Sequence, residues 1–146
     1  MSQVEAQAQS PVIYTRGELE ERLQDVNEKA KVVVKRLKMA VGMLRHIPSY
    51  LYLNTKVDLD VLEDISYRIG HLENAVLNAL DELVISELKL DTDIGKYERE
   101  FNIKFMYDKQ YVMPLGVVML KEKDRVKPVV VWINYFKPII GYSEED

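Results

Sequence analysis

The sequence contains no cysteine, and this absence removes several kinds of chemistry. Disulfide bonds, thiolate nucleophiles and zinc–thiolate sites are excluded. The two histidines, His46 and His71, lie 25 residues apart on different expected helices, so they lack the i, i+3 or i, i+4 spacing of a metal site. No serine lies in a G-x-S-x-G frame, and the six glycines form neither a phosphate-binding loop nor a G-x-G-x-x-G motif. We therefore expect a protein without enzymatic activity, cofactor or metal.

Long hydrophobic runs are also missing. No uncharged segment approaches the roughly 20 residues of a transmembrane helix, and the first residues lack the basic-then-apolar pattern of a signal peptide. The composition is that of a globular protein, with 47% hydrophobic and 30% charged residues. We expect a cytoplasmic protein with no membrane association. Few glycines and many Lys, Glu, Val, Ile and Tyr residues are typical of a thermophilic source.

The stretch from Thr15 to Ile47 has the periodicity of one long helix. A capping box between Thr15 and Glu18 begins it, and Pro48 is expected to stop it. Its apolar residues recur in alternating steps of 4 and 3, which draws one stripe along the helix. The stripe is Leu19, Leu23, Val26, Ala30, Val33, Leu37, Ala40, Leu44 and Ile47. A helix of about thirty residues spans roughly 45 Å, so the stripe needs a second long helix to cover it.

That second helix is expected from about Asp58 to Leu90, after a connector at 48–55 whose tyrosines and leucines pack over the end of the helix pair. Thr55 or Asp58 is its expected cap, and Gly70 inside it suggests a close helix crossing. Its stripe is Leu62, Ile65, Ile69, Leu72, Val76, Ala79 and Leu83. Because both stripes have the same heptad-like period, the two helices are expected to pack side by side near +20°.

Beyond residue 104, after a shorter third helix, the periodicity changes to that of strands. Segments 115–121 and 127–136 are rich in Val, Ile and aromatic residues and flank a charged turn, which predicts a β-hairpin. The second strand is apolar on both faces, so both faces should be covered. An all-helical segment at 115–140 is the weaker alternative, because of Pro128, Pro138 and the β-branched run.

The sequence therefore predicts a mainly α fold with a small β element, an α+β domain. It should contain two long antiparallel helices, a shorter helix and a C-terminal β-hairpin, which a short N-terminal strand at 11–14 can join. Residues 11–140 form the single domain. A disordered tail at 1–10 precedes it and an acidic tail at 141–146 follows it.

Charge is strongly divided along the chain, although the net charge is only −4. Residues 29–57 carry seven bases and no acid, whereas residues 58–100 carry twelve acids and four bases. Several bases share one helix face, which can neutralise phosphates. The alternative is a solvated face that pairs with the acids of the second helix. The basic candidates are Lys31, Lys35, Arg36, Lys38 and Arg45.

The acidic helix and the tyrosines supply two further candidate surfaces. Carboxylates spaced along a rigid helix can imitate a phosphate backbone and enter a basic channel; solubility and intramolecular pairing are the alternative. The acidic candidates are Asp58, Glu63, Asp64, Glu73, Asp81 and Glu82. Tyrosine is enriched at protein interfaces, and nine of the thirteen aromatic residues are tyrosines. The aromatic candidates are Tyr50, Tyr52, Tyr107 and Tyr111.

In length, cysteine-free composition and helical layout with C-terminal strands, the chain resembles a small RNA polymerase inhibitor encoded by an archaeal bicaudavirus. Such an inhibitor occupies the DNA channel of the polymerase and blocks transcription, so the resemblance implies host RNA polymerase as the protein partner. Through its apolar segments PVIY and PVVVWINYF, the chain also resembles the small subunit of archaeal type I-A CRISPR surveillance complexes. The resemblances assign no site residues.

The acidic balance favours the inhibitor, because a DNA-binding subunit should be more basic. We therefore expect a non-enzymatic regulator that binds a nucleic-acid machine. The alternative is a structural subunit of a nucleoprotein assembly, such as a CRISPR small subunit or a capsid protein. Direct binding of nucleic acid is left open.

Overall fold

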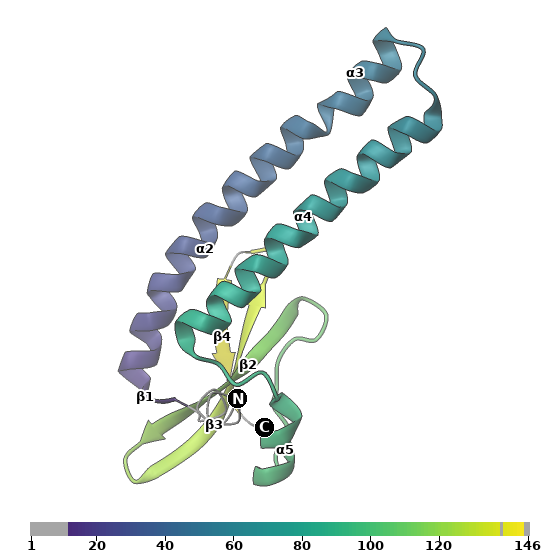
Figure 1. Ribbon diagram of the computed structural model, residues 1–146. Coiled ribbons are helices and arrows are strands. Elements are labelled where there is room, and N and C mark those ends of the chain that lie inside the picture. The colour runs from purple at the N-terminus through teal and green to yellow at the C-terminus, as the bar shows by residue number, and fades with distance from the viewer. Residues whose placement is uncertain (1–11, 138, 145–146) are drawn as a thin grey trace, which may run out of the picture.

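The computed structural model describes residues 12–137 and 139–144. It shows a curled four-stranded sheet beyond which a long pair of helices projects (Figure 1). The expected α+β class is confirmed. The predicted disordered tail at 1–10 and residues 145–146 lie outside the described residues. The elements are β1 (Ile13–Thr15), α2 (Arg16–Leu44), α3 (His46–Asn54), α4 (Leu59–Leu88), α5 (Ile94–Phe101), β2 (Val112–Glu122), β3 (Arg125–Asn134) and β4 (Ile139–Ser143).

The sheet has the strand order β1-β2-β3-β4. Strands β2 and β3 form the predicted antiparallel hairpin, and β1 joins β2 in parallel with Ile13 opposite Met119. The helical alternative for 115–140 is therefore wrong. The acidic tail predicted from residue 141 is also wrong in its first residues, because β4 extends to Ser143 and pairs with β3. Trp132 of β3 fixes the position of β4: its ring lies against Gly141, and its Nε1 donates a hydrogen bond to Ser143 Oγ at 2.9 Å.

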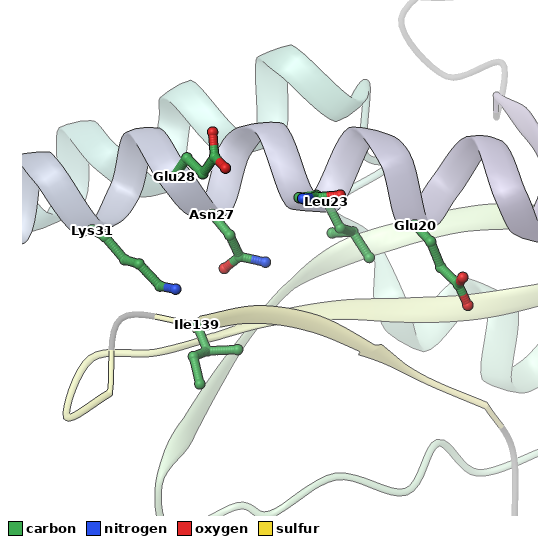
Figure 2. A pocket seen from close by; sticks show the side chains of 7 residues that line it. Glu20, Leu23, Asn27, Glu28, Lys31 and Ile139 are labelled. Carbon is green, nitrogen blue, oxygen red and sulfur yellow. The ribbon is translucent and has the colours of Figure 1, made fainter.

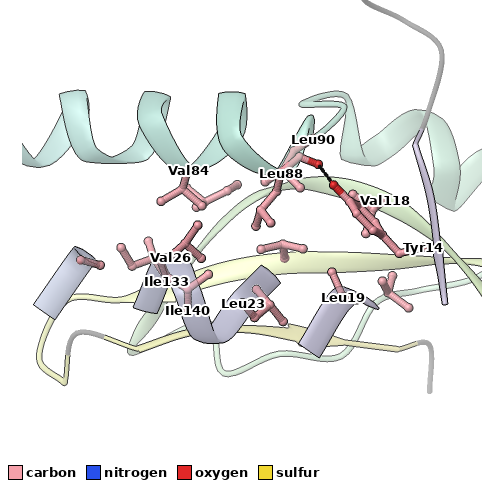
Figure 3. Packing of buried hydrophobic residues seen from close by; sticks show 14 of the residues in the cluster. Tyr14, Leu19, Leu23, Val26, Val84, Leu88, Leu90, Val118, Ile133 and Ile140 are labelled. Atoms are coloured by element: carbon pink, nitrogen blue, oxygen red, sulfur yellow. Dashed lines mark hydrogen bonds between the residues drawn. The ribbon is translucent and has the colours of Figure 1, made fainter. Parts of the chain in front are cut away.

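Both faces of β3 are covered, as its sequence predicts. Val129, Val131 and Ile133 belong to the main core, which α2 and α4 complete from one side of the sheet (Figure 3). Val130 belongs to a second cluster with Tyr97 of α5 and Phe105, on the other side. The main core therefore lies between the helix pair and one face of the sheet, and the alternation of strand side chains explains why one strand serves both clusters.

Helix α2 begins with the predicted capping box. The Glu18 amide donates to Thr15 Oγ1 at 3.2 Å, and the Thr15 amide donates to Glu18 Oε1 at 3.0 Å. The expected stop at Pro48 is wrong, because Pro48 lies inside α3 and the break falls at Arg45. A proline has no N–H, and its ring crowds the carbonyl four residues back, that of Leu44, so the helix is interrupted there.

The segment predicted as a connector at 48–55 is thus mostly helix α3. Arg45 keeps right-handed helical angles (φ −70°, ψ −13°), so α3 continues beyond α2 in nearly the same direction (Figure 1). The chain reverses only after Asn54, and α4 then returns alongside α3 and α2 (Figure 1). Asp58 occupies the N-cap position of α4 without a side-chain hydrogen bond. A Cβ at Gly70 would meet nothing within 4 Å, so the close crossing expected there is wrong.

The line of buried residues along which α2 and α4 meet, which we call the seam, departs from the predicted stripes. On α2 the buried residues change from the expected Val33 and Ala40 to Val34 and Val41, and on α4 the expected Ala79 and Leu83 give way to Leu80 and Val84. A straight helix repeats every 3.6 residues, so a stripe with a 3.5-residue period drifts about 20° per heptad. The seam has the 3.6-residue period of straight helices, so some residues of each predicted stripe lie next to the seam and are not buried in it.

A group of four charged side chains ties the start of α2 to the sheet. The Arg16 guanidinium donates to carboxylate oxygens of Glu122 and, at 2.9 Å, of Glu144. Lys127 Nζ lies 2.7 Å from Glu144 and 3.4 Å from Glu122. Hydrogen bonds from Arg16 hold the pKa of Glu122 below its usual range, and hydrogen bonds from Lys127 do the same for the pKa of Glu144.

We expect this group to make stability depend on pH. A carboxyl whose pKa is lowered by folding stabilises the protein above its unfolded pKa of about 4, and that stability is lost as the pH falls through the folded pKa. Between about pH 5 and pH 2, the melting temperature of Arg16→Gln should therefore fall less than that of the wild type. Arg68→Gln, which removes an exposed i, i+4 pair with Asp64 at 2.9 Å, is the control and should follow the wild type. Parallel curves for all three proteins would contradict the assignment.

Candidate functional site

The helix pair extends beyond the sheet (Figure 1), and we call its residues 35–79, which lie between Val34 and Leu80 of the main core, the helical arm. The arm has a small core of its own, in which Leu37 and Val41 of α2 meet Ile69 of α4. Its buried hydrophobic residues are Leu37, Val41, Leu62 and Ile69, whereas ten large hydrophobic residues of the arm are exposed. The exposed residues are Met39, Met43, Ile47, Tyr50, Tyr52, Leu53, Leu59, Val61, Tyr67 and Leu72. Contiguous exposed apolar residues mark interaction surfaces, so the arm is the candidate functional site.

The end of the arm is its most exposed part. Helix α3 has no buried residue, and Tyr50, Tyr52 and Leu53 are 64%, 64% and 77% exposed. The prediction that these residues pack over the end of the helix pair is therefore wrong. A helix turns successive side chains by about 100°, so an apolar run that becomes helix cannot turn all its members inward. We call residues 46–66, from the start of α3 into the first turns of α4, the arm tip.

The predicted aromatic residues occupy two separate places. Tyr50 and Tyr52 lie on the arm tip, whereas Tyr107 packs against the cluster under α5. Tyr111 contacts Phe136 edge-on, with ring centroids 6.0 Å apart, near the β2 and β3 ends. Only the first pair belongs to the arm, so the four tyrosines do not make one site.

The acidic candidates are spread around α4 instead of forming one face. Glu73 points toward α2, where its carboxylate lies 3.8 Å from Arg45, and Asp64 pairs with Arg68 on the exposed side. Asp81 accepts a hydrogen bond from the Tyr135 hydroxyl and so joins α4 to the sheet. Burial raises the pKa of Asp81, although the bond from Tyr135 acts in the opposite direction. Asp58, Glu63 and Glu82 are exposed.

The basic candidates on α2 remain largely free. Among the described residues, Lys31, Lys35, Arg36 and Lys38 are exposed and form no ion pair within 4.0 Å. The expected pairing with the acids of α4 occurs for Arg45 with Glu73 and for Lys29 with Glu87, both at 3.8 Å. These two contacts are exposed, so each contributes little to stability.

Lys31 also lines an open groove between α2 and β4, together with Glu20, Asn27 and Ile139 (Figure 2). The side-chain amide of Asn27 is already used: its Nδ2 donates to the Ile140 carbonyl at 2.8 Å, and the Ile140 amide donates to its Oδ1. These two hydrogen bonds hold β4 against α2.

The histidines show no sign of shared chemistry. His46 begins α3 and is exposed, and His71 contacts Tyr67 edge-on with ring centroids 4.4 Å apart. Within residues 12–137 and 139–144, no three His, Asp or Glu side chains are grouped so that they could hold a metal ion.

Comparison of the chain with protein-family models, with curated protein sequences and with solved structures finds no match. The two resemblances drawn from the sequence therefore stay hypotheses. In the described part of the chain, no helix combines the length and apolar character needed to cross a bilayer.

Sequence reasoning missed the exposed apolar residues of the arm outside α3. Met39, Met43, Leu59, Val61 and Leu72 are 47–72% exposed. The signal that could have found them is the excess of apolar residues over what one seam can bury. Val32, Met39 and Met43, for example, follow one another in steps of 7 and 4 off the predicted stripe.

Proposed function

We propose that the protein is a non-enzymatic binding protein whose arm tip docks onto a protein partner. The observation that carries this proposal is the exposure of Tyr50, Tyr52, Leu53 and Leu59, each 63–77% exposed, at the end of a projecting helix pair. Tyrosine is prominent among interface residues that dominate binding energy, because it combines a large rigid apolar ring with a hydroxyl. A helix pair also presents these side chains with little loss of backbone entropy.

The partner that we propose is a machine that handles nucleic acid, with RNA polymerase as the leading candidate. The arm tip carries four acids, Asp58, Asp60, Glu63 and Asp64, and one base, Lys56. A negative tip is attracted into a basic channel, and this attraction speeds encounter. From Leu37 to Asn54 the arm is about 25 Å long, and two helices side by side are about 20 Å wide. These dimensions suit a channel that admits duplex DNA.

In this proposal the protein blocks transcription by competing with DNA for the channel. It acts in the cytoplasm, that of a host cell if the source is a virus. Charge alone does not select a partner, so the apolar residues of the arm tip must fix the pose. Inhibition should therefore depend on both kinds of residue: salt should weaken the charge attraction, and loss of the aromatic side chains should weaken the bound state.

A transcription assay with an archaeal RNA polymerase tests the proposal. The protein should inhibit when it is added before template DNA, and inhibit less when the DNA is bound first or the salt concentration is raised. The triple variant Tyr50→Ser, Tyr52→Ser, Leu53→Ser should raise the half-inhibitory concentration by at least about tenfold. The control triple variant Met106→Ser, Met113→Ser, Phe136→Ser removes side chains of similar exposure (50–75%) at the sheet and should inhibit like the wild type.

The lysines of α2 favour a second candidate, a subunit that binds nucleic acid directly. Lys31, Lys35 and Lys38 are exposed and unpaired among the described residues, and such a row can neutralise phosphates. Tight duplex binding by the isolated protein that weakens steeply with salt, and that the three Lys→Glu changes abolish, would support this candidate. It would also reject the inhibitor, as would a wild-type protein that leaves transcription unchanged.

A further inference from the structure

One side of the helix pair carries the apolar residues that the seam leaves out. Val33 and Ala40 of α2 each precede a buried residue by one position, and so do Ala79 and Leu83 of α4. A step of one residue turns a side chain by about 100° about the helix axis. Because α2 and α4 run in opposite directions (Figure 1), the same turn on both helices points to the same side of the pair.

The opposite side of the pair faces the sheet, which checks this geometry. Asn27, one position after buried Val26, bonds to Ile140 of β4, and Asp81, one position after buried Leu80, bonds to Tyr135 at the end of β3. Residues that precede the buried ones therefore face away from the sheet. We call this surface the outer side. Val33, Ala40, Ala79 and Leu83 lie on it by this rule. Four further residues lie three positions after or four before a buried one, which turns them about 40–60° from the buried line toward the same side; they are Leu44, Ile65, Leu72 and Val76.

The outer side is apolar along most of its length, and part of it is open to solvent. Leu72 and Leu83 are 51% and 47% exposed, and Ala40 and Ala79 are exposed too. Val33, Leu44, Ile65 and Val76 are half-buried along the margin of the seam. These eight residues are apolar, but the same rule also places charged residues on this side: Lys29, Arg36, Arg68 and Glu87 each precede a buried residue. The outer side is therefore an apolar stretch along both helices that charged residues interrupt and border.

We propose that the outer side is the interface of a homodimer, in which two helix pairs pack face to face as a four-helix bundle. The footprint from Ile65 to Leu83 and across both helices is about 27 Å by 20 Å. Two such surfaces bury on the order of 1,100 Å² in total, which is above the roughly 1,000 Å² expected of a biological interface and just below the roughly 1,200–2,000 Å² of stable ones. In a four-helix bundle, α2 and α4 would each pack against each other and also against a helix of the second copy.

Charge complementarity favours a second copy of the chain as the partner of the outer side and sets the relative orientation of the two copies. Residues 29–45, the second half of α2 and its C-cap, carry six bases and no acid, whereas α4 carries seven acids and one base. A twofold axis parallel to the helices places α2 of each copy against α4 of the other, which is attractive. An axis perpendicular to the helices would place α2 on α2 and α4 on α4, which is repulsive. The proposed dimer therefore has both arm tips at the same end.

The ion pairs within one chain show which residues meet across this dimer. Lys29 lies level with Glu87, and Arg45 lies level with Glu73, so Arg36 lies level with Asp81 and its neighbour Glu82. An axis parallel to the helices preserves these levels between copies. Arg36 precedes buried Leu37 and so lies on the outer side of α2, whereas Glu82 lies next to Leu83 at the edge of that side on α4, and both are exposed. In the dimer Arg36 thus faces Glu82 of the second copy.

Sedimentation equilibrium or light scattering of the whole chain tests the dimer. The wild type should have twice its 17.0 kDa chain mass at micromolar concentration. Ala40→Glu or Leu72→Glu places a charge on the outer side and should weaken association by at least about tenfold. The controls Asn74→Glu and Asn78→Glu add the same charge at exposed positions of α4 outside the proposed interface and should remain dimeric. A monomeric wild type, or a dimer that Leu72→Glu leaves intact, would overturn the proposal.

A second experiment tests the direction of the two chains. Because the chain has no cysteine, Thr55→Cys gives one spin-label position at the end of each arm. Electron–electron distance measurement should give about 20–30 Å between labels, the width of a bundle, and opposed arms should give more than about 40 Å. Arg36→Glu and Glu82→Arg should each weaken the dimer, and the double variant should recover it. The longer distance, or no recovery, would reject this arrangement.

The dimer can be separated from the proposed docking of the arm tip. Leu72→Glu changes the outer side and leaves Tyr50, Tyr52 and Leu53 in place. The Tyr50, Tyr52 and Leu53 variant leaves the outer side unchanged and should stay dimeric. Either proposal, the homodimer or the docking of the arm tip, can therefore be rejected without affecting the other.

Discussion

Replacement of Leu88 by alanine should lower the free energy of unfolding by about 3–5 kcal/mol. Leu88 is the last residue of α4, its side chain is 0% exposed, and it lies in the main core between the helices and the sheet (Figure 3). Its carbonyl also accepts a hydrogen bond from the Tyr14 hydroxyl at 3.0 Å, so the surroundings are fixed from several sides. A site held in this way cannot collapse to fill the cavity, which makes truncation costly.

Urea unfolding of a short series of variants measures this effect. Leu37→Ala, in the small core of the arm, should cost about 2–3 kcal/mol, because fewer buried side chains surround it. Leu53→Ala is the control: its side chain is 77% exposed, so the change should stay within about 0.5 kcal/mol. A midpoint for Leu88→Ala equal to that for Leu53→Ala would show that the core does not lie where Figure 3 places it.

The parts of the fold that could be predicted from the sequence depend on local signals. The capping box of Thr15 and Glu18 needs only four neighbouring residues, and the β2–β3 hairpin needs only β-branched runs and a charged turn. The burial of β3 on both faces follows from its lack of alternation. Pro48 shows where a local signal is incomplete, because proline also fits the first turn of a new helix.

The seam between the helices could not be predicted as well, because a small error in period accumulates along a long helix. The stripe is right from Leu19 to Ala30 and wrong by one residue at Val33 and Ala40. The difference between periods of 3.5 and 3.6 residues is small per turn, but two heptads displace a side chain by about 40°. The residues displaced in this way form the outer side of the helix pair.

The candidate sites were the least predictable part. A count of charges along a segment does not show how they are arranged around a helix: Glu63 and Asp64 are neighbours, yet they point about 100° apart. The acidic face predicted from such residues is therefore dispersed, and Glu73 and Asp81 pair with Arg45 and Tyr135. Exposure of the arm tip depends on its projection beyond the sheet, which is a tertiary feature with no local signal.

Gly116→Ala should lower the free energy of unfolding by about 1–3 kcal/mol, although it adds a single methyl group. A Cβ at Gly116 would lie 2.7 Å from the Asp91 carbonyl oxygen and 2.7 Å from Leu90 Cβ. Asp91 forms two backbone hydrogen bonds with Val117: its amide donates to the Val117 carbonyl at 3.0 Å, and its carbonyl accepts from the Val117 amide at 2.8 Å. The methyl group must displace this backbone, and no flexible side chain can give way instead.

Gly70→Ala is the matched control, because it makes the same chemical change where there is room. Gly70 lies within α4, and a Cβ there would meet nothing within 4 Å. Alanine should therefore stabilise the helix by roughly 0.5–1 kcal/mol through its higher helix propensity. The two variants should shift the urea midpoint in opposite directions. A stabilising Gly116→Ala would mean that the Asp91–Val117 contact can move without cost, and that the link between α4 and α5 is not held against β2 as tightly as these distances require.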